Sequence, residues 1–275
     1  MNILNLKRAV VFTAFFLIGC SSDQSRINYA LDTANQHGFT AEVIPAKFPI
    51  QIFYKNLKSK HAVFYLEGDG LVINIRGEVA QNPTPTDPMA LKLASVDNRA
   101  ISKIVINRPF HYTNRINADS RYWTTARYSP EVIQTIYDVI KICKSRFNFE
   151  TIEIVAYSGG AAVALLLAPK FDNLTKITSF AGNLDHVNWT KYHKAQPLFE
   201  SLDPLKNKAV LAKISQTHFV GESDDNTTVE LAQIYKQKVG PNNITIVPVP
   251  SFSHDSNWPE IWQAQIKVED KSKNY

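Results

Sequence analysis

Strand-like and helix-like segments alternate along most of this chain, and their order limits the available folds more than any other feature. Short runs rich in β-branched and aromatic residues predict strands, and apolar residues at helical spacing predict helices between them. The predicted strands are residues 39–46, 48–55, 61–68, 102–107, 151–157, 175–182, 213–221 and 243–249. The predicted helices are residues 88–96, 130–147, 159–168, 228–239 and 258–268. This order predicts an α/β fold with a mostly parallel sheet, helices on both faces and an opening hairpin.

Length and composition fit one domain with a sizeable core. The chain has 275 residues, of which 44% are hydrophobic and 20% are charged. Its net charge is +5, and the basic residues after the first segment are scattered instead of forming a stripe. A protein that binds nucleic acid more often shows clustered lysine and arginine, so the composition argues against that class of partner.

The first twenty residues differ from the rest of the chain. Lys7 and Arg8 precede an apolar run that ends at Gly19 and is too short to span a bilayer, which is typical of a secretory signal. Leu17-Ile18-Gly19-Cys20 resembles the lipobox of bacterial lipoproteins. That resemblance implies a signal peptide at 1–19 and a Cys20 that carries diacylglycerol and an acylated amine. An ordinary signal followed by a chance cysteine, or a buried leader helix, is the alternative.

The residues around the lipobox suggest where an anchored domain would reside. Ser21 and Ser22 follow Cys20 without an aspartate, which in a Gram-negative lipoprotein favours the outer membrane. Residues 20–38 are then the lipidated cysteine and tether, within which 24–37 form either a weak helix or part of the tether. The domain extends over 39–268, and a polar tail over 269–275.

The second cysteine, Cys143, lies on the apolar face of the predicted helix 130–147. Lipidation of Cys20 would leave no pair for an intrachain disulfide. We therefore expect Cys143 to be a buried, unreactive thiol.

A serine stands at the joint between a predicted strand and a predicted helix. Ser158 follows strand 151–157, and the active groups of such sheets gather beyond the carboxyl ends of the strands. Ala156 and Gly160, two positions on either side, are small as a sharp turn requires. The pattern matches the nucleophile elbow G-x-S-x-G with alanine at the first glycine. The alternative is a serine that caps a helix.

The base and the acid are sought by chain order, which in this fold is serine, acid, histidine. Of the seven histidines, His254 alone follows the last predicted strand. The acid is expected after strand 213–221, where the form Gly-x-x-Asp favours Asp224 over Asp225, and a helix cap is the alternative role. His254 would take the serine proton, and the aspartate would orient the imidazole.

The oxyanion donors would be backbone N–H groups from two places. One is Gly159, directly after the serine, and the other is Asp69 or Gly70 in the glycine-containing loop that follows strand 61–68. An ordinary Asp-Gly turn is the alternative for that loop.

With these parts in place, residues 39–267 resemble the α/β-hydrolase superfamily, and more narrowly a largely uncharacterised group of bacterial lipoproteins with this fold. The shared forms are YLEGDG (65–70), PTPTDPMALKLA (83–94), NRP (107–109), YWTTARYSPEVI (122–133), AYSGGA (156–161), NLDHVNWTKYH (183–193) and PLFESLDP (197–204). The resemblance implies a three-layer α/β/α fold, a short lid within 183–208, and no metal or organic cofactor. The relatives often have a tryptophan after the GDG loop, where this chain has Val72 and Ile73.

The sequence as a whole predicts a membrane-anchored serine hydrolase. Ser158, Asp224 and His254 would cleave a small-molecule carboxylic ester through an acyl-enzyme. A thioesterase or a small-peptide hydrolase would use the same residues. A non-catalytic envelope protein that retains the fold is the remaining alternative.

Overall fold

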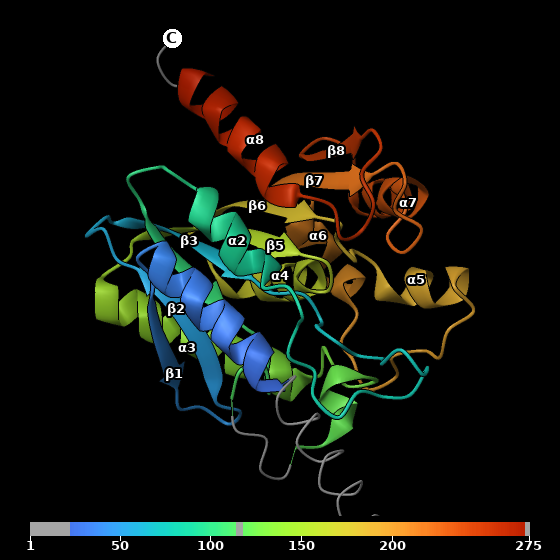
Figure 1. The fold of residues 1–275 in the computed structure, drawn as a ribbon. Coiled ribbons are helices and arrows are strands. Elements are labelled where there is room, and N and C mark those ends of the chain that lie inside the picture. Colours follow the sequence, from blue (N-terminus) through green and yellow to red (C-terminus); the bar gives the residue numbers. More distant parts are fainter. Residues whose placement is uncertain (1–22, 114–117, 273–275) are drawn as a thin grey trace, which may run out of the picture.

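One mostly parallel sheet forms the centre of the molecule (Figure 1). The computed structural model describes residues 23–113 and 118–272. In this part of the chain the sheet has eight strands in the order β1-β2-β4-β3-β5-β6-β7-β8. Their bounds are Thr40–Ile44 (β1), Ile50–Lys55 (β2), His61–Leu66 (β3), Ser102–Ile106 (β4), Thr151–Tyr157 (β5), Leu174–Phe180 (β6), Ser215–Gly221 (β7) and Ile244–Val249 (β8).

The direction of the strands confirms the predicted architecture. β1 and β2 form an antiparallel hairpin, and β2 is antiparallel to β4. From β4 onward, every neighbouring pair is parallel, so the carboxyl ends of β3, β5, β6, β7 and β8 meet at one end of the sheet. Residues that directly follow these strands can therefore share one site.

Helices cover both faces of the sheet and give the molecule three layers (Figure 1). One apolar cluster packs α3 (Pro130–Phe147), α4 (Gly160–Leu167) and α7 (Val229–Val239) on the first face. A second cluster packs a helix at 23–36, α2 (Met89–Val96) and α8 (Trp258–Ser272) on the other face. The shorter helices are α5 (His186–Tyr192), α6 (Lys208–Leu211), η1 (Ser120–Trp123), η2 (Ala168–Lys170) and η3 (Pro204–Asn207).

Helix α3 shows how local sequence sets an element. The Ser129 side chain accepts a hydrogen bond from the N–H of Val132, and Pro130 occupies the first turn, where its missing N–H costs nothing. Asn148, in the left-handed conformation, ends the helix. Cys143 lies on the buried face, and burial raises the pKa of its thiol to about 12. The expectation of a buried thiol is confirmed.

Several expected boundaries were wrong. Helix α2 begins at Met89, one residue later than expected, and Glu67, directly after β3, accepts the N–H of Ala90 in its first turn while Asp87 pairs with Lys92. Residues 183–208, in which the resemblance implies a short lid, contain the helix α5. Helix α8 continues to Ser272, into the expected polar tail.

The segment that was interpreted as a weak helix or a tether is a helix over 23–36, whose Ala30 and Ala34 are buried against the domain. The predicted signal at 1–19 and the predicted lipidation site at Cys20 lie outside the described residues. Within the described residues, no helix is both long enough and apolar enough to cross a bilayer.

Candidate active site

Ser158 lies in a sharp turn between β5 and α4. Its φ of 49° is in the left-handed region, which a residue with a side chain adopts rarely and at a cost in strain. The turn is held by hydrogen bonds from the Ser158 N–H to the Phe180 oxygen (3.0 Å) and from the Asn183 N–H to the Ser158 oxygen (3.0 Å). At Gly160, a Cβ would stand 2.6 Å from the Leu66 carbonyl oxygen, so the turn excludes a larger residue there.

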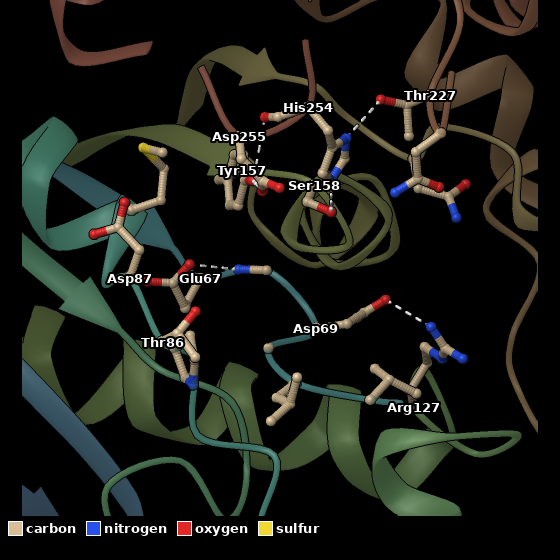
Figure 2. Close-up of a pocket in the computed structure, with 18 of the residues that line it drawn as sticks. Glu67, Asp69, Thr86, Asp87, Arg127, Tyr157, Ser158, Thr227, His254 and Asp255 are labelled. Atoms are coloured by element: carbon tan, nitrogen blue, oxygen red, sulfur yellow. Dashed lines mark hydrogen bonds and ion pairs between the residues drawn. The ribbon is translucent and has the colours of Figure 1, made fainter. Parts of the chain in front are cut away.

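His254 meets the serine from the loop between β8 and α8. The distance from Ser158 Oγ to His254 Nε2 is 2.9 Å, within hydrogen-bonding range (Figure 2). The backbone oxygen of His254 accepts hydrogen bonds from Trp258 Nε1 (2.8 Å) and from the Tyr157 hydroxyl (3.3 Å). Two buried aromatic residues therefore fix the position of this loop.

Asp224 completes a hydrogen-bonded chain of three side chains. Its Oδ2 lies 2.9 Å from His254 Nδ1, and its Oδ1 accepts the N–H groups of Asn226 (2.8 Å) and Thr227 (2.9 Å). Burial alone would raise the pKa of this carboxyl, but the hydrogen bond and the charge of His254 together with the Thr227 contacts hold it below its usual value. Asp225, the alternative acid, is exposed, and the hydrogen bonds of His254 Nδ1 go to Asp224 and Thr227 instead.

The loop after β3 lies beside the serine. Gly70 has a φ of 72°, and a Cβ there would stand 2.0 Å from the Pro83 oxygen, so this position requires glycine. Within the described residues, no group accepts a hydrogen bond from the N–H of Gly159, Asp69 or Gly70. These three predicted donors are therefore unpaired at the edge of the site.

The carboxylate of Asp69 is held by two arginines and a tyrosine. Arg108 and Arg127 each approach it to 2.9 Å, and the Tyr128 hydroxyl donates to it at 2.9 Å. Burial would raise the pKa of Asp69, but the two guanidinium groups lower it overall. This carboxylate packs against Gly159, where a Cβ would come within 2.2 Å of it. Figure 2 shows it directed at Arg127, so the cation offsets a negative charge that lies close to the serine.

A cavity of about 620 Å³ opens above these residues. This volume lies in the range of small-molecule sites. Its wall includes Ser158 and His254, the Asp69-Gly70 loop, Trp189 of α5, and Leu71, Val72 and Ile73. Glu67 also lines it, and burial raises the pKa of its carboxyl to about 7, although the N–H groups of Gly68 and Ala90 oppose this shift. In the described residues, no group of three histidine, cysteine or acidic side chains is arranged to hold a metal ion.

Sequence reasoning missed the residues that support this chain of side chains. Tyr157, Thr227 and Trp258 hold the histidine and the aspartate, yet none has a chemically reactive side chain that would single it out. Arg108 and Arg127 lie far from Asp69 in sequence, and no local pattern pairs them.

Comparison with known proteins identifies the fold. No protein-family model matches the chain, and no curated protein matches it. Among solved structures, it is similar to an α/β serine hydrolase homologue from Coxiella burnetii, with TM-score 0.57, 11% identity, and 83% of this chain and 96% of that chain covered. An esterase from Pyrococcus furiosus has TM-score 0.58 and 13% identity, with 84% and 88% covered. A bacterial membrane phospholipase A has TM-score 0.61 and 12% identity, with 99% and 98% covered.

The protein therefore has the three-layer α/β-hydrolase fold that its sequence predicts. At these identities the likeness defines the fold, and the activity must be argued from the site.

Proposed function

We propose that this chain is a serine hydrolase that cleaves carboxylic esters. The observation that carries the proposal is the chain of hydrogen bonds from Ser158 through His254 to Asp224, at 2.9 Å for both links, on the wall of a cavity. A serine hydroxyl is a weak nucleophile until a base takes its proton, and this arrangement supplies that base and a carboxylate that orients it. The solved proteins of this fold include an esterase and a serine hydrolase homologue, which supports the proposal.

The reaction follows from the positions of the groups. Ser158 Oγ attacks the ester carbonyl carbon while His254 Nε2 takes its proton, and the carbonyl oxygen becomes an oxyanion that the N–H of Gly159 and the loop at Asp69-Gly70 stabilise. The C–O bond to the alcohol then breaks, and His254 returns the proton to the leaving oxygen. Water attacks the acyl-enzyme with His254 again as base, which releases the acid and restores the serine hydroxyl.

We also propose that acylated Cys20 anchors the domain to the bacterial cell envelope, at the outer membrane. The support is the lipobox sequence and its charged, short apolar leader. Two or more acyl chains would hold the domain firmly, whereas one would hold it only marginally. Mass spectrometry of the N-terminal peptide from cells checks this, because a Cys20→Ala variant should lose the acyl mass.

A fluorophosphonate probe tests the activity. We expect it to label Ser158 in the folded protein, and Ser158→Ala to abolish labelling without changing the melting temperature by more than a few degrees. A panel of esters, thioesters and short peptides with a common acyl group then determines which leaving group, an alcohol, a thiol or an amine, the enzyme accepts. An unlabelled Ser158 in folded protein would instead support a non-catalytic envelope protein.

A further inference from the structure

A short hairpin projects from the molecule between β3 and α2. Ile73 and Val79 face each other across an isolated antiparallel bridge. At its tip the Asn74 N–H donates to the Glu78 oxygen (2.8 Å), and the Gly77 N–H donates to the Asn74 oxygen (3.0 Å). We name residues 72–80 the apolar hairpin. Figure 1 shows the segment that contains it extending away from the sheet.

The apolar hairpin exposes branched apolar side chains to solvent. Ile75 at its tip is 104% exposed, Ile73 is 48% exposed and Val79 is 45% exposed. Single apolar residues on a surface are ordinary, but three within seven positions of one turn form a patch that in other proteins marks an interaction site. Arg76, also exposed, places a positive charge beside Ile75, while the carboxylate of exposed Glu78 accepts a hydrogen bond from Asn74 Nδ2 (3.1 Å).

The base of the hairpin is fixed to the domain. The Ala80 oxygen accepts a hydrogen bond from Trp123 Nε1 (3.0 Å), and the Leu71 N–H donates to the Pro83 oxygen (2.9 Å). The two ends of the hairpin are therefore attached to the domain, and the exposed tip projects from a fixed base.

The hairpin stands at the mouth of the cavity that contains Ser158. Leu71, Val72 and Ile73 form part of the cavity wall, so the same strand of the hairpin joins the cavity to the exposed tip. A surface that contacts Ile75 would therefore lie within two residues of the cavity wall at Ile73.

The start of the described chain lies near the base of the hairpin. Arg26, in the first turn of the helix at 23–36, donates a hydrogen bond to the backbone oxygen of Thr84, next to Pro83. Cys20 precedes that helix by three residues, which reach about 11 Å at most when fully extended. An acyl group on Cys20 would therefore bring a bilayer to the side of the domain where the hairpin emerges.

We infer that the apolar hairpin docks on a phospholipid bilayer and turns the cavity mouth toward it. Ile75 and Val79 enter the boundary between headgroups and acyl chains, and Arg76 meets headgroup phosphate. The substrates of the site are then acyl esters presented at a lipid surface. The inference rests on the proposed esterase activity for its substrate class, but the docking itself does not require it.

The first experiment reads the position of the tip directly. Ile75→Cys in the full chain is labelled with an environment-sensitive fluorophore, with Leu57→Cys, at the opposite end of the sheet and 42% exposed, as the matched control. Cys143 is buried and does not compete for the label. A Cys20 that carries no acyl group would react, so the signal of the labelled parent chain, which lacks the introduced cysteine, is subtracted from both variants. The labelled proteins are placed on vesicles of phosphatidylethanolamine and phosphatidylglycerol that carry bromine on the acyl chains.

Quenching of the label at position 75 but not at position 57 is the expected result. The inference is overturned if bromine quenches the two labels to the same extent, whether or not mass spectrometry finds an acyl group on Cys20. A label that is shielded without vesicles, and more so at higher protein concentration, also overturns it, because a second copy of the chain would then cover the hairpin.

The second experiment measures the consequence for substrate. Ile75→Ser/Val79→Ser removes the exposed apolar tip without touching the cavity wall, and Leu57→Ser/Val268→Ser is the matched control at other exposed positions. We expect the hairpin variant to lose roughly tenfold or more in rate on an ester embedded in vesicles, from the lost burial of two apolar side chains. Its rate on a dissolved short-chain ester should match that of the parent.

The dissolved ester separates the two proposals. If the parent does not hydrolyse it, the proposed esterase activity fails, and the fluorescence result still decides the docking. If the parent hydrolyses it and both double variants act equally on embedded ester, the docking inference fails while the esterase remains.

Discussion

Two serine–histidine hydrogen bonds occur within residues 23–113 and 118–272, and one of them has the surroundings of a reactive site. Ser158 Oγ lies 2.9 Å from His254 Nε2, and Ser179 Oγ lies 2.7 Å from His218 Nδ1. The second pair is the shorter, but both of its members are buried in β6 and β7. The second ring nitrogen of His218, Nε2, lies 3.1 Å from Oε1 of Gln216, which is a neutral amide. The second ring nitrogen of His254, Nδ1, lies 2.9 Å from the carboxylate of Asp224.

The difference shows that contact between the two side chains does not by itself define a nucleophile. Ser158 stands in a strained turn on a cavity wall, so a substrate can reach it. Ser179 lies within a regular strand and lines no part of that cavity. Burial also lowers the pKa of His218 to about 3, which makes its imidazole a weak base toward the proton of a serine.

The largest expected effect is the loss of activity when the Ser158 hydroxyl is removed, and removal of the Ser179 hydroxyl is the comparison. Ser158→Ala should lower kcat/KM on a dissolved ester by about 10⁴-fold or more, since a nucleophile removed from such a site loses nearly all of the chemical step. Ser179→Ala should leave fluorophosphonate labelling intact, with some loss of stability because His218 loses its partner. Labelling that disappears in folded Ser179→Ala protein would make the buried pair part of the site.

The acid provides the next largest effect. Asp224→Asn keeps the shape of the side chain but removes its charge, and we expect kcat/KM to fall by about 10³- to 10⁴-fold because the imidazole loses its orienting partner. Asp225→Asn, one residue along at an exposed position, is the matched control and should act like the parent. Equal losses in both variants would show that the local charge of this loop, and not the contact with His254, is what matters.

The sequence could predict the positions of the reactive residues because each follows a strand of a parallel sheet. Ser158 follows β5, Asp224 follows β7 and His254 follows β8, so topology alone brings them to one end. The sequence could not predict the pairing of Asp69 with Arg108 and Arg127, because nothing local joins residues so far apart in the chain.

The buried pair shows the same limit more clearly. Ser179 and His218 face each other because β6 and β7 are neighbours in this register. The order of elements leaves such a register open, so this contact had no signal in the sequence. The chain order also gave no sign that Glu67 would accept the N–H of Ala90 in the first turn of α2.

The smallest of the three effects is on stability, and it distinguishes the two histidines by pH. A buried histidine whose pKa is lowered to about 3 stays unprotonated when folded, while in the unfolded chain it takes a proton below about pH 6.5. The unfolded state therefore binds more protons as pH falls from about 6.5 toward 3, and stability decreases over that window. At pH 5 the loss due to His218 should be about 2 kcal/mol relative to pH 8. Urea unfolding midpoints at several pH values measure it.

A substitution assigns that loss to His218. In His218→Gln, the change in the free energy of unfolding between pH 8 and pH 5 should be smaller by the same amount. A loss of stability that is equal at every pH does not affect this difference. His37→Gln, at an exposed position, is the control. His111 is also buried with a pKa lowered to about 3, so part of the slope must persist in His218→Gln. If His218→Gln and the parent chain show the same dependence of stability on pH, the His218 imidazole of the parent is accessible to protons in the folded state. Burial would then not distinguish the two serine–histidine pairs.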